Sequence, residues 1–140
     1  MLKLLLPVDG SKHSERALRH ALALAAGGLE ADFLLLNVQP ALPPRSSPKS
    51  RRRAEMLRQL EAGEKAMRPA LTLLERAGVP FKSYSRTGAP ADVILKFARE
   101  RHCDAIVMGT RGMGALAGLV LGSVAMKVIQ LAPIPVTLVK

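Results

Sequence analysis

The sequence predicts a single α/β domain built on a five-stranded parallel sheet with helices on both faces. Five apolar runs of strand length recur along the 140 residues, and segments with helical spacing separate them. Most of these runs are almost continuously apolar, as expected for strands that are covered on both faces. No internal repeat divides the chain, so we expect residues 1–140 to form one domain.

The beginning of the chain predicts a strand, a helix and a second strand. Residues 2–8 (LKLLLPV) are mostly apolar and end at Asp9. Ser11 or Ser14 can cap the helix that follows, because a serine oxygen accepts hydrogen bonds from free N–H groups of the first turn. Residues 33–38 (FLLLNV) form the second strand, and the crossover between the two strands should be right-handed.

A long polar helix is expected next, from about residue 50 to residue 77. Pro69 lies within it and predicts a kink or a break near residues 67–68. Residues 41–53, which overlap the start of this helix, are expected to form a flexible basic loop. The predicted apolar stripe of the helix consists of Leu57, Leu60, Ala66, Ala70, Leu71 and Leu74.

The second half of the chain supplies three more strands. Residues 79–86 alternate between apolar and polar side chains, a pattern that suits the edge of a sheet. Pro90 marks the first turn of the next helix. Residues 105–108 predict a buried fourth strand, residues 124–131 a helix, and residues 136–139 the last strand.

A glycine-rich segment follows the fourth strand, within the sequence DAIVMGTRGMGALAGLVLGSV. A strand, a glycine-rich loop and a helix capped by Ser123 are together typical of a phosphate-binding site, since free N–H groups at a helix N-terminus attract anions. The loop lacks the Lys-Ser/Thr ending of a P-loop, and GTRGMG does not fit the spacing GxGxxG. A flexible surface loop with no ligand is the alternative interpretation.

The spacing of Gly109, two residues, Gly112, nine residues, then Gly122 and Ser123 resembles the signature of the universal stress protein family, specifically its ATP-binding branch. The resemblance extends over essentially the whole chain and includes the sequence PVDGS at residues 7–11. It implies a Rossmann-like fold of the adenine nucleotide alpha hydrolase type, with strand order 3-2-1-4-5. Ligands of such sheets bind at the carboxyl ends of the strands where the order reverses, here between strands one and four.

The resemblance also implies which residues bind the nucleotide. Asp9 would accept a hydrogen bond from the ribose or from the adenine amino group, and capping of the turn into Ser11 is its alternative role. Val38 would contact adenine through its main chain, and Arg111 would bind a phosphate unless it is only solvated. The full predicted set is Pro7, Asp9, Val38, Gly109, Thr110, Arg111, Gly112, Gly122, Ser123 and Val124.

The function predicted in this way is stress-response signalling by a protein that binds ATP or a related nucleotide (ADP or AMP). Mg²⁺ or Mn²⁺ could accompany the phosphates, although no pair of carboxylates marks a metal site. We expect no catalytic residues and at most slow ATP hydrolysis, because the sequence shows no P-loop lysine and no positioned general base. The resemblance further implies a homodimer formed through residues 136–139.

Two other function classes stay open, one from the charge distribution and one from the family resemblance. The net charge is +10, and Arg45, Lys49 and residues 51–53 carry five cations without an acid between them. Nucleic-acid binding through this run is one alternative, although the lack of interleaved aromatic residues favours a solvated loop. A nucleotide-free interaction protein of the same family is the other. The single cysteine, Cys103, and the absence of a membrane-spanning apolar run predict a cytoplasmic protein without membrane contact.

Overall fold

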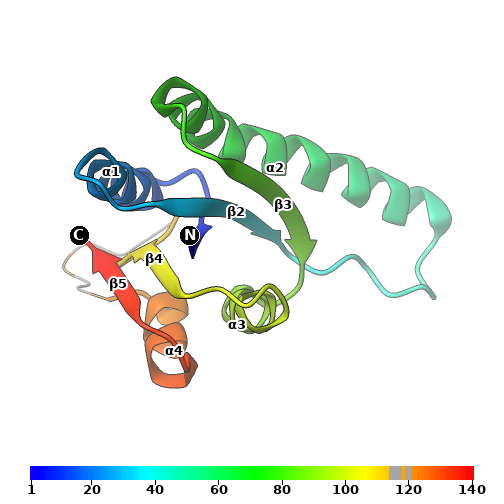
Figure 1. Ribbon diagram of the computed structural model, residues 1–140. Helices are drawn as coiled ribbons and strands as arrows, with labels where there is room; N and C mark the ends of the chain where they lie inside the picture. Colours follow the sequence, from blue (N-terminus) through cyan, green and yellow to red (C-terminus); the bar gives the residue numbers. More distant parts are fainter. Residues whose placement is uncertain (114–117, 119–120) are drawn as a thin grey trace.

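The computed structural model describes residues 1–113, 118 and 121–140, which form five strands and four helices (Figure 1). In chain order they are β1 (Leu2–Pro7), α1 (Lys12–Ala26), β2 (Ala31–Gln39), α2 (Lys49–Ala77), β3 (Phe81–Thr87), α3 (Pro90–Glu100), β4 (Ala105–Gly109), α4 (Ser123–Leu131) and β5 (Val136–Val139). Within this part of the chain, no helix is long and apolar enough to cross a membrane.

The strands form one parallel sheet in the order β3-β2-β1-β4-β5, which confirms the predicted fold and strand order. β1 lies at the centre, where Leu4 is in register with Phe33 of β2 and Ala105 of β4. β3 and β5 form the two edges. The alternation of polar and apolar side chains in the third strand therefore does indicate an edge strand.

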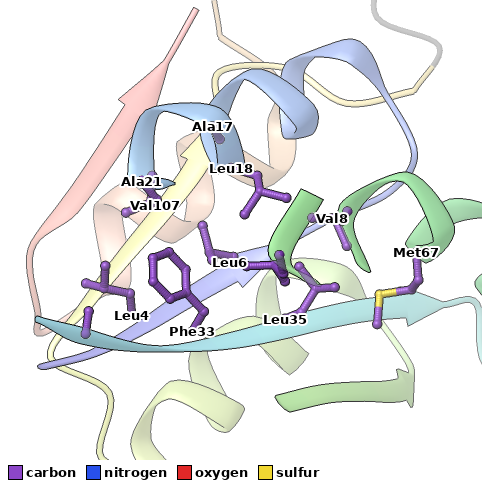
Figure 2. Packing of buried hydrophobic residues seen from close by; sticks show 13 residues of the cluster. Leu4, Leu6, Val8, Ala17, Leu18, Ala21, Phe33, Leu35, Met67 and Val107 are labelled. Atoms are coloured by element: carbon purple, nitrogen blue, oxygen red, sulfur yellow. The ribbon is translucent and has the colours of Figure 1, made fainter. Parts of the chain in front are cut away.

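Two hydrophobic layers cover the sheet, one on each face. α1 and α2 pack on one face, and α3 and α4 on the other (Figure 1). Figure 2 shows the first layer, in which Leu6 and Phe33 from the sheet point toward Leu18 of α1. Phe97 of α3 and Val128 of α4 are buried in the second layer. Because apolar burial is the main driving force of folding, these layers fix the sheet on which any site is built.

Local signals explain where most elements begin and end. Ser11 caps α1, since its Oγ accepts the N–H of Ser14 at 3.2 Å, and Gly27 ends the helix. Pro90 occupies the first turn of α3, where its missing N–H costs nothing. Gly78 ends α2 in the left-handed conformation, with φ of 67°, which glycine adopts without strain.

The α2 helix differs from the prediction in three respects. It begins at Lys49, close to the predicted residue 50, so Arg51, Arg52 and Arg53 belong to its first turns and not to the predicted loop of residues 41–53. It continues through Pro69, so of the predicted kink or break the break does not occur. The predicted apolar stripe is only partly buried: Leu74 is inaccessible, whereas the N-terminal part of the stripe is exposed, with Leu60 at 64%. The reason is that the first turns of α2 extend past the ends of β2 and β3 (Figure 1).

Candidate functional site

The main cavity opens at the carboxyl ends of β1 and β4, the point where the strand order reverses, and has a volume of about 400 Å³. All of the predicted site residues except Thr110 line it. Asp9 and the glycine-rich segment thus meet across one crevice, as their positions after β1 and β4 predicted. A cavity of this size is within the range of small-molecule sites.

Thr110 is the exception among the predicted residues. It is buried and does not line the cavity. Its N–H donates to the Val139 carbonyl at 3.0 Å, and its carbonyl accepts the Gly122 N–H at 2.7 Å. Thr110 therefore connects β4 to the end of β5 and to the start of α4, which is a structural role.

Eight lining residues were not predicted. Several of them follow from the same rule, because they lie at the carboxyl edge of the sheet or in the first turns of the helices that begin there. Pro90 and Ile94, for example, occupy the first two turns of α3. The unpredicted lining residues are Val8, Ser14, Leu36, Pro90, Ile94, Met108, Met113 and Ala125.

The start of α4 supplies hydrogen-bond donors to the cavity. Met126 donates to the Gly122 carbonyl at 2.9 Å, which is the first bond of the helix. The N–H groups of Ser123, Val124 and Ala125 therefore have no acceptor within the helix, and all three residues line the cavity. Together with the helix dipole, these groups favour an anion.

The cap of α4 is not the predicted one. Gly122 is the N-cap residue, and no side chain among the described residues makes a capping hydrogen bond. Ser123 is instead the first residue of the helix. The serine side chain is thus not used to satisfy the helix end, and the N-terminus keeps its free donors.

Main-chain groups of Val38 are also directed into the crevice. In β2, Gln39 accepts a hydrogen bond from Gly88 on the β3 side, whereas Leu36 accepts the Val8 N–H on the β1 side. Because alternate residues of a strand bond to opposite neighbours, Val38 faces the β1 side. β1 has ended at Pro7, and the Val8 carbonyl is already bonded to Asn37 Nδ2 at 2.8 Å. This arrangement leaves a main-chain donor and acceptor of Val38 beside the cavity.

Two glycines of the signature spacing, Gly109 and Gly112, are in close contact with other parts of the protein. A Cβ on Gly109 would lie 2.8 Å from the carbonyl carbon of His13, in the first turn of α1. A Cβ on Gly112 would lie 2.5 Å from Asp9 Oδ2. Neither glycine has a positive φ, so close approach and not backbone conformation requires glycine here. The spacing alone is therefore not evidence of a phosphate.

Asp9 and Arg111 are the charged side chains among the described lining residues. Asp9 Oδ1 accepts the Ser11 N–H at 2.9 Å, which is the turn-capping role considered for it, and Oδ2 accepts the Met113 N–H at 3.0 Å. The Nε of Arg111 is buried and has no hydrogen-bond partner in the described part of the structure. An unsatisfied buried donor of a guanidinium is costly, and an anion in the cavity would remove that cost.

A second hollow lies at the other end of the strands, where β4 and β5 begin, and Cys103 is one of its lining residues. Burial raises the pKa of the Cys103 thiol, and the nearby positive charge of Lys3 only partly opposes this effect. His102 and Asp104 on either side are exposed, whereas Cys103 is buried. A buried thiol with a raised pKa is a weak nucleophile, so this hollow does not have the character of a catalytic site.

Comparison with known proteins gives the family. A model of the universal stress protein family matches residues 1–140. The chain belongs to the universal stress protein family. A relative from Thermus aquaticus, the universal stress protein in the QAH/OAS sulfhydrylase 3′ region, is 40% identical over 139 residues, which cover 98% of this chain and 97% of the relative.

Solved structures of similar proteins share the fold of this universal stress protein. The structure of the hypothetical protein MJ0577 superposes with a TM-score of 0.86 at 30% identity and covers 99% of this chain and 95% of its own. A universal stress protein solved in complex with cAMP gives a TM-score of 0.67 at 26% identity and covers 99% and 97% of the two chains. The Rossmann-like prediction is thereby confirmed.

Proposed function

We propose that this universal stress protein binds an adenine nucleotide, ATP or its diphosphate or monophosphate, in the crevice between β1 and β4. The observation that carries the proposal is the polarity of the cavity. N–H groups at the start of α4 and the Arg111 Nε, all without a hydrogen-bond partner among the described residues, lie on the β4 side, and apolar side chains with the Val38 main chain lie on the β2 side. A nucleotide has the matching chemistry, with an anionic end and an apolar base.

Residues of β2 and α3 form the base end of the proposed site. Val38 and Ile94 offer apolar surface to the flat faces of a purine. The main-chain N–H and carbonyl of Val38 form a donor and acceptor pair that matches the acceptor N1 and the amino group of adenine. Guanine presents the opposite pattern on this edge, so this pair favours adenine. The related structure solved with cAMP supports an adenine nucleotide.

The start of α4 forms the phosphate end of the proposed site. Three N–H groups of its first turn have no main-chain acceptor among the described residues, and none of the described lining side chains other than Asp9 is acidic. Mg²⁺ or Mn²⁺ could accompany a triphosphate and would be held mainly by the phosphates, since the described residues contain no cluster of three His, Cys, Asp or Glu side chains. Asp9 already accepts two main-chain N–H groups and is a poor general base, so we expect at most slow hydrolysis.

The biological role proposed here is signalling by a binding protein, in which a partner recognises the nucleotide-bound form. We place it in the cytoplasm, where adenine nucleotides are abundant. We also propose a homodimer formed through β5, because this strand is a short apolar edge strand that a second copy could extend. Sedimentation at several concentrations would test the dimer, and a strictly monomeric protein at micromolar concentration would contradict it.

The binding proposal is tested by placing a side chain at the start of α4. Gly122 has φ of −77° and ψ of 163°, which any residue adopts, and a Cβ there meets no atom closer than 3.4 Å. Gly122→Val therefore has an allowed backbone and Cβ, and a circular dichroism spectrum checks that the variant folds. Its branched side chain should obstruct the N–H groups of the first turn and weaken ATP binding at least about tenfold in calorimetry. Ala132→Val, at the other end of α4, is the matched control and should bind as the wild type does. Equal binding by both variants would contradict the proposed location of the phosphates.

A further inference from the structure

One carboxylate joins the two sides of the crevice. Asp9 Oδ1 accepts the Ser11 N–H at 2.9 Å and so belongs to the turn between β1 and α1. Asp9 Oδ2 accepts the Met113 N–H at 3.0 Å, across a sequence separation of 104 residues. These two bonds tie the turn after β1 to the segment after β4, and each pairs a carboxylate with a main-chain donor.

The sequence around Met113 is adapted to this contact. Gly112 has no positive φ, yet a Cβ on it would lie 2.5 Å from Asp9 Oδ2, closer than real Cβ contacts come. The next atom of the carboxyl group, Cγ, would be 3.7 Å away, so the conflict is with this one oxygen. An alanine at residue 112 would therefore push the Asp9 carboxylate away from the Met113 N–H, whereas the local backbone itself would accept the substitution.

We infer that Asp9 is a positioning residue, which holds the Gly112–Met113 segment against the turn after β1 and so places the phosphate end of the site. This inference rests on the proposed function for its effect on nucleotide binding. Asp9 acts through the loop and does not depend on contact with the sugar or the base. Both of its oxygens are engaged with N–H groups before any ligand arrives.

A positioning role and a direct contact with the ribose predict different losses of affinity for adenosine, AMP and ATP. If Asp9 positions the loop, its loss weakens binding in proportion to the interactions made by the phosphates, so ATP is affected and adenosine is not. If Asp9 binds the ribose hydroxyls directly, adenosine, AMP and ATP lose the same factor. Because Asp9 is exposed at the mouth of the crevice, the effect expected from one lost charge-assisted hydrogen bond is modest, about fivefold.

The first experiment measures the contact without any nucleotide. Asp9→Ala, Gly112→Ala and the double variant are unfolded in urea, and their free energies of unfolding form a double-mutant cycle. We expect Gly112→Ala to destabilise the wild type modestly, by about the worth of the hydrogen bond between Asp9 and the Met113 N–H, since the carboxylate can rotate away from the new methyl group. The Asp9→Ala background should lose much less, because the conflicting oxygen is then gone. Equal effects of Gly112→Ala in both backgrounds would overturn the inference.

The second experiment uses calorimetry with adenosine, AMP and ATP as probes. Asp9→Asn keeps the shape of the side chain but has one acceptor oxygen where the carboxylate has two. It should weaken ATP binding about fivefold and leave adenosine binding within about twofold of the wild type. Asp32→Asn, on β2 and outside the cavity lining, is the matched control and should leave all three affinities unchanged.

The two experiments distinguish failure of the inference from failure of the proposed function. An equal loss for adenosine and ATP in Asp9→Asn, or tighter ATP binding, would overturn the positioning role. If folded, nucleotide-free wild type binds none of the three probes, the proposed function fails. In that case the double-mutant cycle alone decides whether Asp9 holds the Gly112–Met113 segment.

Discussion

Replacing Gly109 by alanine should destabilise the protein without any ligand being involved. A Cβ at this position would lie 2.8 Å from both the carbonyl carbon and the Cβ of His13 and 2.9 Å from its carbonyl oxygen. Two of these atoms belong to the backbone of the first turn of α1, so no side-chain rotation can relieve the conflict. Either β4 or α1 must move, and both are anchored in the core.

The expected cost follows from the effect of overpacking. Inserting one carbon into a well-packed interior typically costs about 1–3 kcal/mol, and a conflict with backbone atoms belongs at the upper end. For a domain of this size, a loss of about 3 kcal/mol lowers the melting temperature by about 10 °C. Urea unfolding followed by circular dichroism gives the free energy of unfolding, and a thermal scan gives the melting temperature.

Gly122→Ala is the control for this experiment. A Cβ on Gly122 has its nearest neighbours at 3.4 Å, which is ordinary contact, and its φ of −77° suits alanine. Its cost should stay below about 1 kcal/mol, the usual effect of a weaker helix cap. A Gly109→Ala variant as stable as the wild type, or no less stable than Gly122→Ala, would refute the packing explanation of Gly109.

Three further predictions concern the remainder of the fold. Leu74→Ala removes an inaccessible side chain of α2 and should lower the free energy of unfolding in urea by about 2–5 kcal/mol. Leu60 is 64% exposed on the same helix, so Leu60→Ala should change it by less than about 0.5 kcal/mol, and similar costs for the two variants would refute the burial described here. Lys127→Met breaks the 2.8 Å ion pair with Asp92 between α3 and α4. Since both side chains are about half exposed, the loss of stability should be under about 1 kcal/mol and should shrink in high salt; a loss that salt does not change would contradict this. Burial raises the pKa of the Cys103 thiol in the folded state. The stability that this contributes is present below the pKa of the unfolded chain and is lost as the pH rises through the pKa of the folded protein. The stability of the wild type relative to Cys103→Ala should therefore fall with rising alkaline pH, and a rise would contradict the shift.

The sequence predicted the sheet well because its strands are distinct in composition. The runs at residues 2–8 and 105–108 are apolar enough to be covered on both faces, and β1 and β4 are both interior strands of the sheet, as this requires. Once two strands are known to be neighbours, the residues after them must meet at one edge. For this reason Asp9 and the glycine-rich segment could be placed together although β1 and β4 are far apart in sequence.

Helix boundaries and exposure were predicted less well, because they depend on where an element ends relative to its neighbours. Leu57 and Leu60 continue the apolar spacing of α2, but the sheet does not extend beneath them. Spacing along one helix cannot show how far the opposing strands reach. In the same way, the choice of Gly122 over Ser123 as the cap of α4 depends on the bond from Gly122 to Thr110, a contact with β4.

The packing role of the glycines was beyond the reach of sequence reasoning for a different reason. Gly109 is required by His13 and Gly112 by Asp9, and both partners come from the other end of the chain. The spacing of the glycines could be recognised, but a pattern does not show whether a ligand or the protein itself fills the space. The geometry attributes these two positions to the protein and leaves the start of α4 and Arg111 as the features that favour an anion.

The most direct test of nucleotide binding is a calorimetric titration of the wild-type protein, after acid extraction has shown that no nucleotide was carried through purification. ATP and GTP are titrated in parallel, because the main chain of Val38 should discriminate between the two bases. The account predicts saturable ATP binding in the micromolar range and clearly weaker binding of GTP. A folded, nucleotide-free protein that binds neither nucleotide, or that binds both equally well, would contradict it.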